Sequence, residues 1–259
     1  MSSIIKVDTI QDQAGNNIIN ESGNTITIGA SGDTITIPSG ATFTNSGTTS
    51  AITISGALSV DGGTIKLDGN YPTGTDNVAL GNEALDSGSL SGGNNTAIGD
   101  NALSANTSGS NNTAIGQAAL CTNLTGGSNV AVGRCTLKLN TASNNVAVGY
   151  HSMCTTSSGT ENTAIGMSSL KSNTTADFNT ALGNQTLCKN TTGTNNTAVG
   201  ACALEANTTG GNNVAVGKSA LITNTTGICN TALGRTSMEL NTTGSCNVAV
   251  GKDALSNNT

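Results

Sequence analysis

The side chains best suited to chemistry in this 259-residue chain are seven cysteines and a single histidine. The cysteines take three fixed positions relative to a repeated glycine: five residues after it (Cys121, Cys154, Cys188), two after it (Cys135, Cys202) and five before it (Cys229, Cys246). We expect these variable positions to face solvent. The odd count and the lack of a CxxC motif or Cys/His cluster favour free thiols over a zinc site. The last two cysteines stack one repeat apart, within the Cα range of a disulfide, so that pairing stays open.

The remaining candidates do not form a recognisable active site. No column of acidic residues accompanies His151, the only histidine. Cleavage of a polysaccharide needs paired carboxylates in a groove. The carboxylates of the repeat region are instead dispersed over different copies and positions: Glu161, Asp177, Glu205 and Glu239. The chain also lacks a phosphate-binding motif. We therefore expect no enzyme activity, no catalytic or metal-binding residues and no cofactor.

Composition limits the partners and the fold. Nine Lys and Arg against fifteen Asp and Glu give a net charge of -6, and the cations form no basic stripe for nucleic acid. No apolar run approaches the roughly 20 residues of a membrane span, and the N-terminus lacks a signal-peptide core. We expect a soluble product made in a cytosol. With 34 Gly, 2% aromatic and 9% charged residues, stacked repeats are favoured over one compact core.

One short sequence recurs eleven times and must position these side chains. Ala stands two residues before the repeat glycine and Asn four before it in all eleven copies, and Val, Ile or Leu directly precedes it. Leu stands four residues after it in nine copies, with Met153 and Met238 in the others. The step is 17 residues in most copies. The glycines are Gly81, Gly99, Gly116, Gly133, Gly149, Gly166, Gly183, Gly200, Gly217, Gly234 and Gly251.

The pattern N-[TV]-A-[VIL]-G predicts a strand of about four residues, and the N-T-T-G that follows predicts a turn. Each copy is then one coil of a parallel β-solenoid, spaced about 4.8 Å from the next. The positions of Asn213, Ala215, Gly217 and Leu221 should form structural ladders through all coils, because in-register stacking repeats one residue type at one place. We expect the aliphatic residue before Gly to join Leu in the core.

The balance between apolar burial and backbone entropy in one coil indicates that the chain associates with further chains. Two large apolar groups in each coil scarcely offset about 1–2 kcal/mol of backbone entropy for every ordered residue. The unbroken Ala column suggests that another surface approaches too closely for a larger side chain. We therefore expect several chains to pack along a common axis and bury the small-residue face.

The chain divides into three parts. Residues 1–20 are not repetitive, and we expect them to be a docking segment. Residues 21–75 contain the repeats GNTITIGAS (23–31) and GDTITIPSG (32–40), which predict a thin β-stalk of short strands. Residues 76–259 hold the repeats and form the shaft. The predicted fold class is all-β.

The array NNTAIGDNALSANTSG…NNTAIGQAAL resembles the repeats of bacteriophage tail fibres and related virion appendages, and the NxVAIG head repeats of trimeric autotransporter adhesins. The opening IIKVDTIQ is similar to the start of marine phage fibres. An autotransporter would need a secretion signal and a membrane anchor, which favours the phage comparison. The resemblance implies a homotrimeric left-handed parallel β-roll, assembled in the host cytoplasm and located in the virion.

The same comparison implies partners. They are two further copies of the chain, another virion protein at residues 1–20, and a host-surface glycan or protein, with no nucleic acid and no membrane insertion. Exposed polar and aromatic residues on a rigid scaffold suit receptor contacts. The binding candidates are Arg134, Tyr150, His151, Met167, Phe178 and Arg235. Two alternatives stay open: a structural filament without a receptor, and an ice-binding solenoid that templates water on Thr208, Thr225 and Thr242.

Overall fold

A computed structural model describes residues 75–258. The expected docking segment, residues 1–20, and all but the end of the expected β-stalk, residues 21–75, lie outside the described residues.

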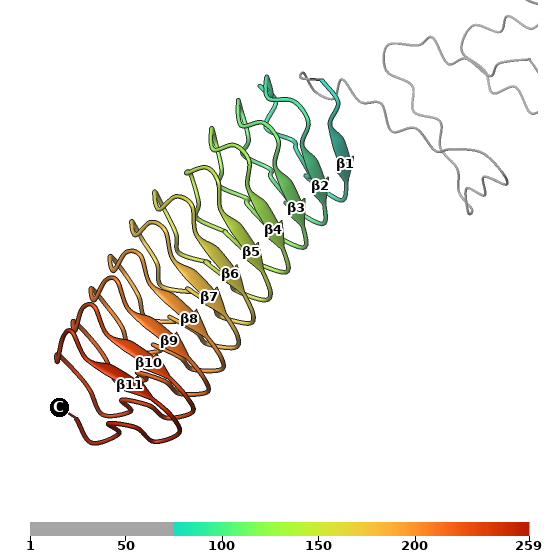
Figure 1. Cartoon of the computed structure of the whole chain (residues 1–259). Helices are drawn as coiled ribbons and strands as arrows, with labels where there is room; N and C mark the ends of the chain where they lie inside the picture. The colour runs from blue at the N-terminus through green and yellow to red at the C-terminus, as the bar shows by residue number, and fades with distance from the viewer. Residues whose placement is uncertain (1–74, 259) are drawn as a thin grey trace, which may run out of the picture. The chain divides into compact units, whose positions relative to one another are not determined.

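The described part is a parallel β-solenoid with one three-residue strand in each coil. All eleven strands belong to one parallel sheet, in which each pairs with the strands of the coils before and after it. Figure 1 shows them side by side in chain order, from β1 to β11. The strands are β1 Val78–Leu80, β2 Thr96–Ile98, β3 Thr113–Ile115, β4 Val130–Val132, β5 Val146–Val148, β6 Thr163–Ile165, β7 Thr180–Leu182, β8 Thr197–Val199, β9 Val214–Val216, β10 Thr231–Leu233 and β11 Val248–Val250. The predicted all-β solenoid is confirmed for this part of the chain, which contains no helix.

The strands pair so that each residue of one copy lies opposite the equivalent residue of the next copy. Ala215 of β9 lies opposite Ala232 of β10, as each strand alanine lies opposite the next. Hydrogen bonds between coils continue outside the strands: the N–H of Leu221 donates to the carbonyl of Ser237 at 3.0 Å. The N–H of Thr225 donates to the carbonyl of Thr242 at 2.8 Å. The whole coil is therefore bonded to its neighbours, which explains why a 17-residue unit with only three strand residues stacks regularly.

Two ladders of buried asparagine run inside the coils. The side-chain amide of Asn213 donates to Asn196 Oδ1 at 3.2 Å and to the carbonyl of Gly227 at 2.9 Å. Its own Oδ1 accepts the backbone N–H of Asn230 at 2.9 Å. In the second ladder, seven residues after the glycine, Asn224 Nδ2 donates to Oδ1 of the previous coil's asparagine at 2.9 Å. Buried amides are thus satisfied by the same group one coil away.

The core leucine adopts a left-handed backbone conformation. Leu221 has a φ of 51° and is fully buried, as are the equivalent residues of the other coils from Leu85 to Met238. Branching at Cβ is strongly disfavoured in this region. The backbone therefore explains why the column holds Leu or Met but never Val or Ile.

The orientation of the strand differs from the sequence-based expectation. The strand alanines from Ala97 to Ala232 are completely buried inside their own coil, where they belong to the same hydrophobic core as the leucines. They do not present a small-residue face to a partner, and that prediction is wrong. The aliphatic residue before each glycine points outward instead, as in Leu182, which is 42% exposed. The interior is narrow, and beside the buried asparagines it holds one Leu or Met and small residues such as Ala215 and Ala220 in each coil.

The glycine after each strand is required by both conformation and space. Gly217 has a φ of 133°, and a Cβ there would lie 2.6 Å from the carbonyl carbon and oxygen of Gly234. Any other residue would collide with the backbone of the next coil. The chain can turn away from the sheet at this point only because the position is glycine.

Candidate functional site

The variable side chains gather on the turn that follows each repeat glycine. We call the residue directly after the glycine the post-glycine position; along the shaft it forms a column of exposed or half-buried side chains. The next residue has a φ near 55–60° in most coils, so the backbone reverses there and the buried Leu follows two residues later. Neighbouring members of the column come from neighbouring coils, which brings residues 16 to 18 apart in sequence into contact.

Three of the six sequence-predicted candidates meet at one place in this column. Arg134 donates from Nε to Gln117 Oε1 at 2.8 Å and from Nη1 to the Tyr150 hydroxyl at 3.4 Å. Its guanidinium carbon lies 5.7 Å from the centre of the Tyr150 ring, in cation–π range. The rings of Tyr150 and His151 stack with centroids 4.0 Å apart and an interplanar angle of 17°. The guanidinium is thus held from two sides.

The surroundings of this contact are positively charged. Burial lowers the pKa of the only histidine, and so do the positive charges around it. These belong to Lys171, Arg134 and Lys138. The ion pairs of residues 75–258 are Lys189–Glu205 and Lys252–Asp253, so within this part Lys138 and Lys171 have no acidic partner. We call the five residues the central patch: Arg134, Lys138, Tyr150, His151 and Lys171.

The remaining candidates occupy other places. Met167 is exposed in the coil after Tyr150, at the same post-glycine position. Arg235 shares that position but lies near β10, six coils from Arg134. Phe178, which is 54% exposed, precedes β7 and therefore lies at the opposite end of the strands. Its φ of 58° is a conformation that aromatic residues seldom adopt. The structure thus brings three candidates together and separates the other three from them to different degrees.

No family model, curated protein or solved structure matches this chain. The function must therefore be argued from the geometry of the shaft and from the chemistry of its surface.

The two lysines of the central patch were missed as candidates. Lys138 and Lys171 stand five residues after their glycines, two coils apart, with Cys154 between them. Their sequence context is that of any scattered surface lysine. A usable signal did exist: the sequence contains no Asp or Glu between Asp100 and Glu161, the stretch that holds Arg134, Lys138 and His151.

The cysteines differ in their accessibility. Cys229 and Cys246 are exposed, whereas Cys135 is buried, which contradicts the expected solvent-facing placement of that residue; all seven thiols are free. Cys121, Cys154 and Cys188 are half-buried, and that burial raises the pKa of each thiol.

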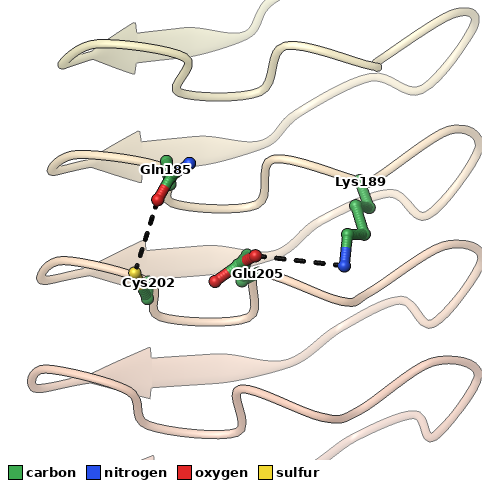
Figure 2. A network of polar contacts seen from close by, with 4 residues as sticks. All are labelled: Gln185, Lys189, Cys202 and Glu205. Carbon is green, nitrogen blue, oxygen red and sulfur yellow. Dashed lines mark hydrogen bonds and ion pairs between the residues drawn. The ribbon is translucent and has the colours of Figure 1, made fainter.

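A second polar network surrounds Cys202. Figure 2 shows it across two neighbouring coils, with Cys202 and Glu205 on one and Gln185 and Lys189 on the other. The thiol donates to Gln185 Oε1 at 3.9 Å, and Glu205 lies 3.9 Å from Lys189 Nζ. Burial raises the pKa of Cys202, and the hydrogen bond and negative charge of Glu205 raise it further. A raised pKa favours the protonated thiol over the more nucleophilic thiolate.

Two of the dispersed carboxylates make structural contacts within the shaft. Asp177 Oδ1 accepts the backbone N–H of Thr160 at 2.7 Å and its hydroxyl at 3.1 Å. Glu205 pairs with Lys189. Residues 75–258 contain no group of three His, Cys, Asp or Glu side chains that could hold a metal ion. The same part of the chain has no helix with the length and apolarity needed to cross a bilayer.

In the threonine column considered for ice binding, the side-chain hydroxyls donate hydrogen bonds to the next coil. Thr208 Oγ1 donates to the carbonyl of Thr225 at 3.1 Å, and Thr225 Oγ1 donates to that of Thr242 at 3.1 Å. A hydroxyl that donates to the next coil has no proton left to offer to ordered water. This arrangement disfavours an ice-binding role for these threonines.

Proposed function

We propose that the chain is a subunit of a bacteriophage fibre, in which three copies associate into a shaft that carries surface residues toward the host cell. The observation that supports this most is a stack of eleven coils, bonded throughout its interior, that leaves an uncharged apolar face uncovered. A scaffold of this kind has a mechanical and adhesive role, and residues 1–20 would attach it to another virion protein.

The uncovered surface is the outer sheet face, formed by the strand residues one and three before each repeat glycine. The first column holds only Val, Ile or Leu and the second only Val or Thr. Leu80, Leu182 and Leu233 are each more than 40% exposed. Ten coil steps of about 4.8 Å make this face about 48 Å long. A three-residue strand spans about 10 Å, so the face covers about 480 Å², a size at which an apolar patch is often functional.

A second copy of the same chain fits this face better than a different partner. The face carries no charge that would repel an identical surface, and its aliphatic residues recur at every coil, so two parallel copies match along their whole length. A homotrimer around a common axis would cover the outer sheet faces of all three chains.

The interior explains how such a shaft stays stiff. Backbone hydrogen bonds, two asparagine ladders and a continuous Leu and Ala core tie each coil to the next. Since each coil contacts only its neighbours, length can be added without changing the fold. Three copies would present every surface residue three times, which strengthens weak contacts through avidity.

A charge on the outer sheet face tests the association. We expect Leu182→Lys to convert a trimer of about 76 kDa into monomers of 25.4 kDa, measured by light scattering, without loss of β-sheet circular dichroism. The control is Leu240→Lys, at a site equally apolar and 47% exposed but outside the strands, which should leave the trimer intact. A wild-type chain that scatters as a monomer would contradict the trimer.

The virion assignment needs a separate test. Antibodies raised against the purified chain should label an appendage on phage particles in electron micrographs, and the purified fibre should bind host cells. Labelling of virions without binding to cells would favour the structural filament. Particles that carry no label would refute the fibre proposal.

A further inference from the structure

Apart from the first coil and Met238, the regular repeat is interrupted in the coils between Gly133 and Gly166. The step from Gly133 to Gly149 has 16 residues, whereas the following steps have 17. In the next coil Met153 replaces the core Leu and Thr156 replaces the ladder Asn. The hydroxyl of Thr156 is buried and has no hydrogen-bond partner. Such departures lower stability, and proteins tend to retain them at functional sites.

The central patch lies on the outside of these same coils. Arg134 uses two of its five guanidinium N–H groups for Gln117 and Tyr150, and the others remain for a ligand. Holding the planar group from two sides lowers the entropy lost when it binds. Lys138 and Lys171 add two unpaired charges at a separation of about 10 Å, the height of two coils. A region of positive charge therefore exists on a chain whose net charge is -6.

We propose that the central patch binds the anionic groups of an acidic saccharide. The guanidinium of Arg134 suits a carboxylate or a sulfate, which it can hold through two parallel hydrogen bonds. The two lysines suit further charges along an extended chain. Tyr150 and His151 supply an aromatic surface and a hydroxyl beside these charges. The inference deepens the proposed function, on which it rests, because it gives a ligand class to the host-binding surface.

The size of the patch favours a saccharide over nucleic acid. Nucleic-acid binding commonly neutralises six to ten phosphates, roughly, and needs a longer basic surface. The patch offers Arg134, Lys138 and Lys171. A single weak contact of this kind becomes useful when three chains repeat it around one shaft.

Binding of the purified full chain to defined oligosaccharides tests the proposal. The probes are an oligogalacturonate, a sulfated dextran oligosaccharide and neutral dextran of equal length, measured by isothermal titration calorimetry. We expect one or both acidic probes to bind, the two arms showing whether carboxylate or sulfate is preferred, and affinity to fall as salt rises. Arg134→Gln and Lys171→Gln should each weaken binding about fivefold. The matched control is Lys218→Gln, which removes a positive charge at the same repeat position as Arg134, five coils away, and should bind like the wild type.

Several outcomes would overturn the proposal. They are failure of both acidic probes, equal binding of neutral dextran, an equal loss in the Lys218→Gln control, or tighter binding of a single-stranded DNA of the same charge. Light scattering and circular dichroism of each variant ensure that a loss of binding is not a loss of assembly. If virions carry the label and cells bind while the saccharides do not, the patch assignment fails and the fibre proposal stands.

Discussion

The asparagine ladder allows a quantitative test through Asn196, which is fully buried between two coils. Its amide nitrogen donates to Asn179 Oδ1 at 3.2 Å and to the carbonyl of Gly210 at 2.9 Å. Its Oδ1 accepts both the backbone N–H of Asn213, at 3.0 Å, and the amide of that residue, at 3.2 Å. The substitution Asn196→Ala removes all four contacts.

Only one of the former partners is left without a hydrogen bond. The carbonyl of Gly210 keeps the amide of Asn207 at 2.8 Å, and the amide of Asn213 keeps the carbonyl of Gly227 at 2.9 Å. The backbone N–H of Asn213 loses its acceptor. An orphaned buried donor costs about 1–3 kcal/mol. Adding the lost net energy of the other bonds, we expect the free energy of unfolding to fall by about 2–4 kcal/mol.

Guanidinium unfolding followed by circular dichroism measures this loss, which should lower the midpoint by about 0.5–1 M. Amide hydrogen exchange gives a local measurement, because about 3 kcal/mol corresponds to roughly a hundredfold faster exchange at Asn213. The control is Asn184→Ala, an exposed asparagine one coil turn away, which should change neither quantity. Equal shifts in the two variants would refute the view that the ladder bonds stabilise the shaft.

Three further predictions concern the glycine after each strand, the histidine and the thiols. Gly200→Ala should lower the melting temperature by 6 °C or more, roughly, since its φ is 124° and a Cβ would lie 2.7 Å from the next coil's backbone. In the control Gly88→Ala, the added Cβ meets nothing within 4 Å, and the substitution should cost about 1 kcal/mol. Lys171→Gln should raise the pKa of His151 in an NMR titration, because a repelling positive charge is removed; Lys189→Gln should leave it unchanged. Iodoacetamide should label the two exposed cysteines first in peptide mass spectrometry, because burial raises the pKa of the half-buried thiols. These two are Cys229 and Cys246.

The fold of the coil could be predicted because in-register stacking places the same residue type at the same position in every coil. Asn213, Ala215 and Gly217 belong to columns without exceptions, and each column has a physical requirement: an amide ladder, a narrow interior or a turn without Cβ. A parallel in-register stack is the arrangement in which one substitution disturbs identical neighbours above and below. The regularity of the repeat was therefore enough to predict the fold of the coil.

The direction of the strand could not be predicted by the same reasoning. A three-residue strand such as Val214–Val216 has an apolar side chain on both faces, and alternation over so short a length does not say which is inside. Leu221 has a left-handed backbone conformation, and its buried side chain belongs to the same core as Ala215. The absence of Val and Ile from the leucine column was the available sign, because those residues resist this conformation.

The candidate site was predictable only where spacing alone decides contact. Arg134 and Tyr150 share the post-glycine position in consecutive coils, so their contact follows from the repeat. The influence of Lys171 on His151 depends instead on how side chains reach across two coils, and on which acids are missing nearby. Phe178 lies away from the patch because it precedes its strand.

The outer sheet face and the central patch can be used at the same time because the chain turns at the repeat glycine that separates them. The outer sheet face ends at residues such as Val148, and Gly149 then turns the chain so that Tyr150 and His151 follow on the far side of the corner. Copies that pack through their outer sheet faces would leave the post-glycine column at the surface. A charge on Leu182 should then abolish assembly while each monomer keeps its single weak ligand contact, and Arg134→Gln should weaken the contact while assembly persists. Loss of both properties in either variant would mean that the two surfaces are one.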